Sequence, residues 1–450
     1  MMRFRAARPE MGQLVPRVLD AAERLDRDAL RALQGERLAQ TVQRAHRSPL
    51  YRKDLSEWLG FAPSEDVAAY RPLGLDDLDR LPITTKADLR AASNIEDVLA
   101  VPLENVRRWH TSSGTTGRRT PMGYSEADMV NWGRLIQRNL AATGIMAGSR
   151  VHNAYGYGLF TGGLGFETGL GPMGATVLPA SSVPDVEQHL ELMHQHRAQA
   201  LLSTPGLALA LAEAVERNPA LRPPELQAGI FGGDGWSPAL RRHIEVVLGI
   251  RAHDTYGLSE VLGPGVAHAC DQGEGLHLYE DAFLPEVLDP VDGVPLTPGT
   301  DGELVLTTLL NEASPRLRYR TGDRVRIERE RCPCGRTAAR LINVVRADDV
   351  RLYAGRALAP NDIEAALLRM DAVAPTFRVV APGRELDVLR LEVEPKASPP
   401  QDFERSVRRG MESVLDVPVE IRVLASGSLE RSRGKRLRLV DEPWRAGGSA

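Results

Sequence analysis

The residues from Ser112 to Gly117 form the stretch of this sequence best suited to binding an anion. This Ser-Ser-Gly-Thr-Thr-Gly run supplies hydroxyl and backbone N–H donors, and its glycines let the backbone approach a ligand closely. Arg118 and Arg119 follow at once and end the run in positive charge. Because the Gly-Lys-Ser/Thr ending of a P-loop is absent, the common NTPase interpretation does not apply. Alone, such a run is more often a surface linker than a phosphate-binding loop. The choice between the two therefore depends on motifs elsewhere in the chain.

A second candidate site contains all three cysteines of the chain. Cys332 and Cys334 flank one proline on a tight turn, and six residues separate Cys270 from His277. A Cys₃His set is typical of closed, tetrahedral structural zinc. Spacing alone leaves buried free cysteines as the alternative. We do not expect these thiols to take part in catalysis.

Two stretches read as strands that end in polar glycine turns, where such side chains could be positioned. Residues 229–232 run into Gly232-Gly233-Asp234-Gly235, and Ser237-Pro238 then opens a helix, with serine at its cap and proline at its first position. The same pattern, a strand that ends in a polar turn with glycine, recurs at 251–260. Strands that alternate with helices predict an α/β sheet, in which ligands sit beyond the carboxyl ends of the strands.

The chain is expected to divide near residue 346, where the composition changes. Before it, residues 286–345 read as short strands and turns, typical of a β-rich subdomain. The fold class predicted is therefore α/β, with a large N-terminal domain of α/β and β-rich subdomains over 1–345. A small α+β domain over 346–450 completes it, with helices expected near 360–370 and 402–414.

Glycine is dense between Ala154 and Gly165, where aromatic residues alternate with it. One interpretation is a backbone packed tightly around a flat ligand. The other is a glycine-rich helix that packs closely against a neighbour. Elsewhere, helices are expected over 15–47, broken at Ser48–Tyr51, and over 126–143, and Thr84 or Thr85 could cap a further helix.

The overall composition narrows the class of protein. At 450 residues, with 42% hydrophobic and 26% charged residues, two or three globular domains are expected. A net charge of −4 argues against nucleic acid as the main partner. Neither a membrane span nor a signal peptide is predicted. Three cysteines give no disulfide framework, which is expected of a protein of the reducing cytoplasm.

Five motifs in one order resemble those of the adenylate-forming enzymes, the superfamily of acyl-CoA synthetases, adenylation domains and luciferases. They are Thr111–Thr120, Tyr256–Glu260, Tyr319–Asp323, Arg346–Asp349 and Gly434-Lys435. Within this superfamily the chain is most similar to the phenylacetate–CoA ligases. That closer resemblance rests on Leu81–Leu89, Ala154–Gly165, Glu260–Ala267, Tyr279–Glu286 and Gly427–Ser432. It implies that a carboxylic acid attacks the α-phosphate of ATP to give an acyl-adenylate and pyrophosphate, after which coenzyme A displaces AMP.

The resemblance also implies which residues bind the nucleotide. Ser112, Ser113, Gly114, Thr115, Thr116 and Gly117 would hold the pyrophosphate end, and Gly233, Asp234, Asp254, Thr255, Tyr256 and Gly257 would line the adenine and the α-phosphate. The carboxylate of Asp323 would accept hydrogen bonds from both ribose hydroxyls. Arg346 would contact the ribose or a phosphate. Arg118 stands where the family often has lysine, and the acidic turn at Asp234 departs from the usual Ala-Glu-Pro-Trp.

Two residues are expected to act in the first chemical step. Lys435 would be the mobile lysine that bridges the carboxylate and the α-phosphate as charge develops, although a lysine in a basic run is usually a solvated one. Glu260 would be the carboxylate for Mg²⁺, a cation that prefers oxygen ligands. One departure from the family is Glu430, where proline is common.

The small domain is expected to turn between the two chemical steps. Asp348 resembles the hinge of that motion, a gating step known in other hinged enzymes. Residues 355–360 would face the thiol acceptor, and they depart from the family's Gly-Val-Asn-Val-Phe-Pro. This departure leaves a carrier-protein thiol or an amine open as the acceptor beside coenzyme A. Some phenylacetate ligase-like proteins carry a Cys/His cluster near the place found in this chain, which favours structural Zn²⁺ as a further cofactor.

Tyr155, Tyr157 and Phe160 are predicted to wall the pocket for the acid, and core packing is the alternative for these aromatics. Residues 180–185 replace the family's Ser-Gly-Gly-Gln-Thr loop, so a hydroxy- or aminobenzoate is a candidate substrate. The first hypothesis is a cytoplasmic ligase, monomer or homodimer, that joins an aryl acid to CoA. The alternatives are an adenylating enzyme that passes the acyl group to a carrier protein or an amine, and a binding protein without activity.

Overall fold

The computed structural model describes residues 13–59, 74–92, 94–112, 119–432 and 434–444. Its helices are α1 (Arg27–His46), α2 (Pro49–Leu59), α3 (Lys86–Ala91), α4 (Glu126–Ala142), α5 (Gly162–Met173), α6 (Val186–Gln195), α7 (Pro205–Arg217), α8 (Pro238–Leu248), α9 (Pro360–Leu367) and α10 (Phe403–Leu415). Short 3₁₀ helices lie at Ala21–Arg24, Leu75–Arg80, Ile95–Val98, Leu103–Asn105, Pro219–Leu221 and Ala347–Asp349.

Several helices begin where local sequence chemistry predicts. Thr85 caps α3 by accepting a hydrogen bond from the N–H of Asp88. Ser237 caps α8 in the same way, with Pro238 at the first helical position. Each hydroxyl satisfies an N–H that has no partner within its helix. The predicted break at Ser48 separates α1 from α2.

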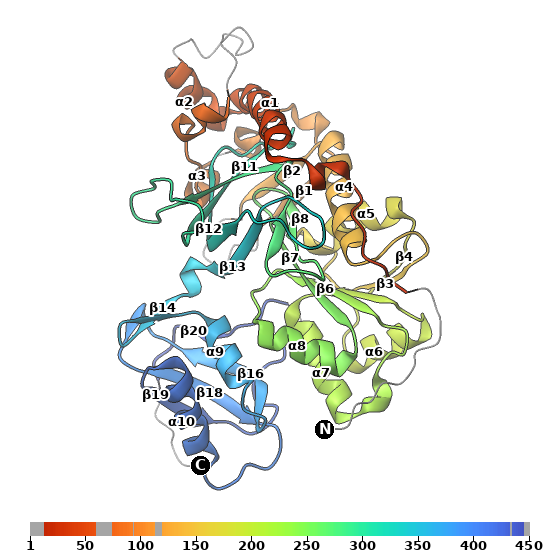
Figure 1. Cartoon of the computed structure of the whole chain (residues 1–450), viewed down its shortest axis with the longest axis vertical. Helices are drawn as coiled ribbons and strands as arrows, with labels where there is room; N and C mark the ends of the chain where they lie inside the picture. Colours follow the sequence, from red (N-terminus) through yellow and green to blue (C-terminus); the bar gives the residue numbers. More distant parts are fainter. Residues whose placement is uncertain (1–12, 60–73, 93, 113–118, 433, 445–450) are drawn as a thin grey trace.

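An eleven-stranded sheet runs through the molecule (Figure 1). Its strands are β3 (Arg150–Asn153), β4 (Thr176–Pro179), β5 (Ala200–Ser203), β6 (Ala228–Gly232), β7 (Arg251–Leu258), β8 (Gly263–His268), β9 (Leu276–Leu278), β10 (Phe283–Leu288), β11 (Gly302–Thr308), β12 (Tyr319–Glu328) and β13 (Arg340–Arg346). The spatial order is β10-β11-β12-β13-β9-β8-β7-β6-β5-β3-β4. Strands β3 to β7 pair in parallel, whereas β7 to β13 pair antiparallel. The α/β and β-rich regions predicted from the sequence are therefore joined at β7.

The end of the glycine-dense stretch, residues 162–165, forms the first turn of α5, which packs against α4. A Cβ added to Gly165 would lie 2.4 Å from the Trp132 ring, and one on Gly169 would lie 2.5 Å from Ile136. Only glycine permits so close an approach of the two helices. The helix-packing interpretation is thus confirmed for residues 162–173.

The C-terminal part of the chain, here residues 346–444, forms two small sheets with α9 and α10. One sheet holds β15 (Arg356–Leu358), β14 (Arg351–Tyr353) and β17 (Glu385–Leu386), and the other holds β19 (Val419–Val423), β18 (Leu389–Pro395), β16 (Val373–Val380) and β20 (Leu439–Val440). Apolar residues of this part, among them Phe377 and Met411, form a core of their own. The exact division at residue 345 stays a prediction.

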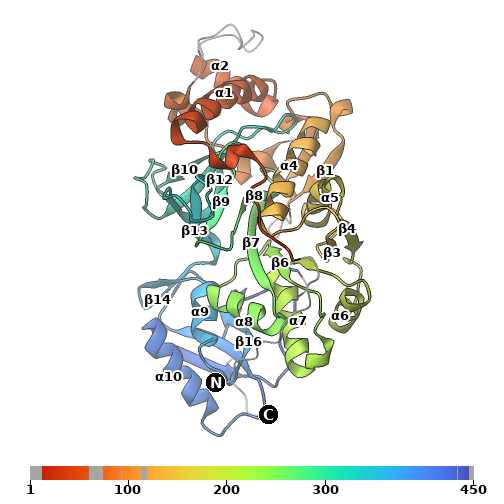
Figure 2. The ribbon, with the colours of Figure 1, turned by 45° about the vertical axis from the view of Figure 1, so that its right-hand side comes forward.

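The C-terminal part lies at one end of the large sheet, with α9 beside α8 (Figures 1 and 2). We call the residues up to 345 the N-terminal part. A hairpin of β1 (Arg108–Thr111) and β2 (Pro121–Tyr124) belongs to it. Within the described residues, no helix combines the length and the apolar character needed to cross a membrane.

Candidate active site and metal centre

The strand β7 carries four of the residues predicted to line the nucleotide. Asn139 of α4 donates a hydrogen bond to the hydroxyl of Thr255, with 2.7 Å between the two atoms. A Cβ on Gly257 would lie 1.9 Å from the carbonyl oxygen of Gly263, so glycine allows β8 to come close. Burial raises the pKa of Asp254 to about 6. These residues lie toward the carboxyl end of β7, and α/β sheets bind ligands beyond the carboxyl ends of their strands.

Tyr256, Asp323 and Arg346 form one hydrogen-bonded group. Strand pairing sets Asp323 of β12 opposite Arg346 of β13. The Tyr256 hydroxyl donates to one carboxylate oxygen of Asp323 over 2.6 Å, and Arg346 donates to the other over 3.0 Å. Burial raises the pKa of Asp323, and the positive charges of Arg346 and Lys435 oppose that rise. The positive charge of Lys435 thus acts on the pKa of this carboxylate, and the catalytic role of Lys435 stays a prediction.

Glu260 is buried and forms an ion pair with Lys86 at the first position of α3. The Lys86 ammonium lies 2.9 Å from one carboxylate oxygen. Burial lowers the pKa of Arg346, but Asp323 and Glu260 offset this, so that pKa lies above its ordinary value. Glu260 therefore belongs electrostatically to the same group as Asp323. A cation bound at Glu260 would share or displace Lys86.

The anion-binding run leaves β1 at Ser112, which is buried. The N–H of Ser112 donates to the carbonyl of Thr120, so the hairpin brings these two residues together. The N–H of Thr111 donates to the carbonyl of Leu159, which attaches the hairpin to the glycine-dense stretch. The remaining residues predicted for the pyrophosphate, Ser113, Gly114, Thr115, Thr116 and Gly117, lie outside the described residues, as does Arg118.

Lys435 is exposed, on a segment that lies against the start of α7. A Cβ on Gly206 would lie 2.7 Å from the carbonyl oxygen of Ser432 and 3.1 Å from that of Gly434. The hydroxyl of Ser432 donates to the carbonyl of Lys435 over 2.9 Å. The backbone beside Lys435 thus touches the N-terminal part, and a glycine makes the contact possible.

Asp234 and Gly233 lie in the turn after β6. Gly233 has a φ of 85°, a left-handed conformation that favours glycine. The Asp234 carboxylate is not free, because Arg436 donates to it over 2.8 Å and Arg438 lies 3.5 Å away. The adenine contact predicted for Asp234 stays a prediction. The structure adds an ionic contact with the C-terminal part.

Asp348 lies in the 3₁₀ helix between β13 and β14, at the junction of the two parts. Its carboxylate is exposed and pairs with Arg384 over 2.7 Å. The hinge role predicted for Asp348 stays a prediction.

The three aromatics predicted for the acid pocket have different surroundings. Tyr155 is buried and stacks on Phe166, with 5.3 Å between ring centroids. Tyr157 donates its hydroxyl to Glu167 over 2.9 Å, whereas Phe160 is exposed. Tyr155 packs in the core, which was the alternative to its predicted place in a pocket wall. The pocket itself stays a prediction.

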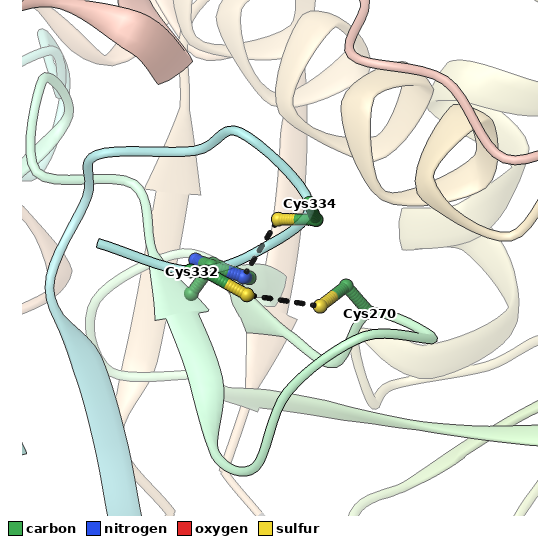
Figure 3. Close-up of side chains that lie close together, drawn as sticks. Cys270, Cys332 and Cys334 are labelled. Carbon is green, nitrogen blue, oxygen red and sulfur yellow. Dashed lines mark hydrogen bonds between the residues drawn. The ribbon is translucent and has the colours of Figure 1, made fainter. Parts of the chain in front are cut away.

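The three cysteines and His277 come together as a candidate zinc centre (Figure 3). Their four ligand atoms lie within 4.8 Å of one another, and the sulfur atoms of Cys270 and Cys332 point toward each other. These sulfurs are 3.7 Å apart, and the sulfur of Cys334 is 3.4 Å from Nε2 of His277. Tetrahedral zinc with its usual bond lengths would set these distances at about 3.8 and 3.6 Å. The residues therefore fit the metal.

The turn that holds Cys332 and Cys334 is followed by residues that contact the segment around the 3₁₀ helix Ala21–Arg24. Gly335 in this turn has a φ of 88° and donates its N–H to Cys332. Arg336 forms an ion pair with buried Glu23, and Thr337 donates its hydroxyl to the carbonyl of Leu25 over 2.6 Å. The cluster thus joins β-rich residues to the first helical turns.

Sequence reasoning did not identify Lys86, Arg431 or Arg436 as site residues. Lysine at the first position of a helix runs against the helix dipole, which was a signal that its charge has another use. The arginines lie in the basic run around Lys435, which has the appearance of a solvated face. Nothing in that run indicates their distant partners.

Comparisons with known proteins show the family to which the chain belongs. The model of the AMP-binding enzyme family matches residues 76–309, and that of the AMP-binding enzyme C-terminal domain matches 355–443. The phenylacetate-coenzyme A ligase of Thermus thermophilus is 38% identical over 444 residues, which cover 93% of this chain and 97% of that protein.

A crystal structure of 2-hydroxyisobutyryl-CoA ligase in the postadenylation state, in complex with R3-HIB-AMP, aligns with a TM-score of 0.84 at 26% identity, over 94% of this chain and 91% of that one. The same ligase in its thioesterification state, with 2-HIB-AMP and CoA, aligns with a TM-score of 0.67 at 27% identity, over 93% and 91%. The chain therefore superposes better on the postadenylation state than on the thioesterification state. This chain belongs to the AMP-binding enzyme family.

Proposed function

We propose that this protein activates an aromatic carboxylic acid with ATP and transfers the acyl group to coenzyme A. The observation that carries the proposal is the 38% identity, over nearly the whole of both chains, to a phenylacetate-coenzyme A ligase. The group formed by Tyr256, Asp323 and Arg346, with Glu260 and Lys435 in electrostatic reach, supports it.

In the first step, a carboxylate oxygen of the acid attacks the α-phosphorus of ATP, and the bond to pyrophosphate breaks. Negative charge develops on the phosphate oxygens, so fixed donors and cations stabilise the transition state. Lys435 supplies one cation and bridges the carboxylate and the α-phosphate. Mg²⁺ held by Glu260 would supply further positive charge. Ser112 begins the loop that we assign to the pyrophosphate.

The ribose and adenine are assigned to residues of β7 and β12. Asp323 accepts from the ribose hydroxyls, in exchange for its present bonds with Tyr256 and Arg346. Tyr256 offers its ring to the adenine, beside Asp254 and Thr255. The Asp323 carboxylate is buried, which strengthens a hydrogen bond to an ionised acceptor.

In the second step, the thiol sulfur of coenzyme A attacks the acyl carbon, and AMP leaves. We assign a rotation of the C-terminal part about Asp348 to the interval between the steps. The different TM-scores against the two states of 2-hydroxyisobutyryl-CoA ligase support such a motion. Structural zinc in the Cys/His cluster and a cytoplasmic location complete the proposal.

The test is pyrophosphate release from ATP with a panel of aromatic acids that includes phenylacetate and hydroxy- and aminobenzoates. At least one acid is expected to drive release, and CoA is expected to yield its thioester with AMP. No release with any acid would favour a binding protein. Transfer to a carrier protein or an amine, but not to CoA, would establish the alternative acceptor.

A further inference from the structure

Two sets of ion pairs flank Lys435, one at Arg431 and one at Arg436. The Nε of Arg431 donates to Glu213 of α7 over 3.0 Å, and its Nη1 lies 2.8 Å from Glu394 of β18. The hydroxyl of Thr376 also donates to Glu213, over 3.2 Å. Arg431 therefore has one carboxylate partner in each part of the chain.

Arg436 repeats this arrangement on the other side of Lys435. Its Nε donates to Asp234 over 2.8 Å, and its Nη2 donates to the carbonyl of Gly235 over 2.6 Å. It also forms an ion pair with Glu364 of α9. Glu364 reaches back to the N-terminal part, where it accepts from the N–H of Ser237 over 2.7 Å. Arg436 thus also has one partner in each part.

Both sets are largely withdrawn from water. The side chains of Asp234 and Arg436 are 12% and 9% exposed, and those of Glu213 and Arg431 are 8% and 23% exposed. A buried charge that loses its only partner is costly. Each arginine here keeps a carboxylate of the C-terminal part, Glu394 or Glu364, if the contact between the parts opens. The ion pairs of the two arginines with Glu213 and Asp234 can therefore break without leaving either arginine unpaired.

We infer that Glu213 and Asp234 position Lys435 for acyl-adenylate formation by holding Arg431 and Arg436, and that these two contacts open before the acyl group passes to the thiol. The inference rests on the proposed function. Because Lys435 lies between the two arginines, fixing both limits where its backbone can move. Glu213 and Asp234 are positioning residues, since they act through the segment that carries Lys435.

The test uses Glu213→Gln, because Glu213 lies on α7, away from the residues assigned to the nucleotide. Its matched control is Glu225→Gln, which removes a carboxylate that pairs with Arg150 and Arg197, both in the N-terminal part. Two reactions are followed in the full chain: acid-dependent ATP–pyrophosphate exchange, and thioester formation from supplied acyl-adenylate and CoA. Glu213→Asp tests rescue by a conservative variant.

Glu213→Gln is expected to slow exchange by about tenfold to a hundredfold, the scale of loss when a catalytic group is slightly misplaced. In Glu213→Gln, thioester formation is expected to stay within about twofold of the wild-type rate or to rise. Glu213→Asp is expected to recover part of the rate of ATP–pyrophosphate exchange. Glu225→Gln is expected to match the wild type in both reactions. If Glu213→Gln slowed both reactions equally, or did not slow ATP–pyrophosphate exchange, the inference would be overturned.

A wild-type protein without acid-dependent exchange would contradict the proposed function rather than the contact. Backbone hydrogen exchange then tests the contact without any activity. Glu213→Gln is expected to speed backbone hydrogen exchange at residues 434–440 relative to the wild type and to Glu225→Gln. Equal exchange in all three proteins would overturn the inference.

Discussion

The Cys/His cluster and the segment that carries Lys435 both join distant parts of the chain, but they do so in opposite ways. All four residues of the cluster belong to the N-terminal part, and no rotation of the C-terminal part needs to separate them. The arginines beside Lys435 have carboxylate partners on both sides of the junction. We propose that the first is a permanent joint and the second a reversible one.

This difference has a physical basis in the groups used. Thiolates and imidazole bind zinc at short, fixed distances and are closed off from exchange. Ion pairs tolerate a change of partner when a second carboxylate is at hand. Zinc in the cluster would therefore stabilise the N-terminal part, while the shared arginines would allow the proposed motion between the two chemical steps.

The largest expected effect is at the reversible joint. Lys435→Ala is expected to slow acid-dependent ATP–pyrophosphate exchange by about 10³-fold, because one cation that stabilises the developing phosphate charge is lost. Thioester formation from supplied acyl-adenylate is expected to continue near the wild-type rate. Lys53→Ala, which removes an exposed lysine paired with Glu57, is the control. Exchange at the wild-type rate would remove Lys435 from the first step.

At the permanent joint, Cys332→Ser is expected to abolish zinc binding, measured by elemental analysis of the purified protein. The unfolding free energy is expected to fall by about 3 kcal/mol, the stabilisation by a ligand present at a hundred times its Kd. The ratio of the two half-reactions is expected to stay unchanged. A wild-type protein that is fully stable and free of metal would count against the cluster as a zinc centre.

A third experiment examines the N-terminal part through the pH dependence of its stability. The pKa of Asp254 lies at about 6, above its ordinary 3.8, because burial disfavours the charged form. Its contribution to stability is therefore fully present below pH 3.8 and is lost as the pH rises through 6. Over that range the wild type is expected to lose about 2 kcal/mol of unfolding free energy relative to Asp254→Asn. Parallel curves for the two proteins in denaturant titrations would contradict the assignment.

The smallest expected effect comes from crowding the reversible joint. Gly206→Ala would set a methyl group 2.7 Å from the carbonyl oxygen of Ser432 and push the Lys435 segment away. Pyrophosphate exchange is expected to slow by about tenfold, or 1.4 kcal/mol. Gly171→Ala is the matched control, since it also adds a methyl group in a helix but meets open space. Equal rates in the two variants would show that the close approach has no role in the first step.

Features that depend on a few neighbouring residues could be predicted from the sequence. The caps at Thr85 and Ser237 and the start of a helix at Glu126 are examples, because hydroxyl capping is a local interaction. The α/β class followed from the alternation of strands and helices. The Cys₃His set could be expected because two of its cysteines share a turn.

Contacts that link distant residues could not be predicted in the same way. Glu213 and Arg431 are 218 positions apart, and each looks like an ordinary surface charge on its own segment. The same holds for Lys86 of α3 and Glu260 of the turn between β7 and β8, which form an ion pair. Tyr155 shows the converse, since an aromatic near glycines fits a pocket wall and a core residue equally well until its stacking on Phe166 is known.

One measurement tests the proposed activity most directly: a single turnover with the wild-type protein, one active aromatic acid and ATP, first without thiol and then with CoA. About one equivalent of acyl-adenylate per chain is expected to accumulate with release of pyrophosphate. Addition of CoA is then expected to convert it to the thioester and AMP. Release of ADP and phosphate, or a thioester that forms without a prior acyl-adenylate, would contradict the two-step account.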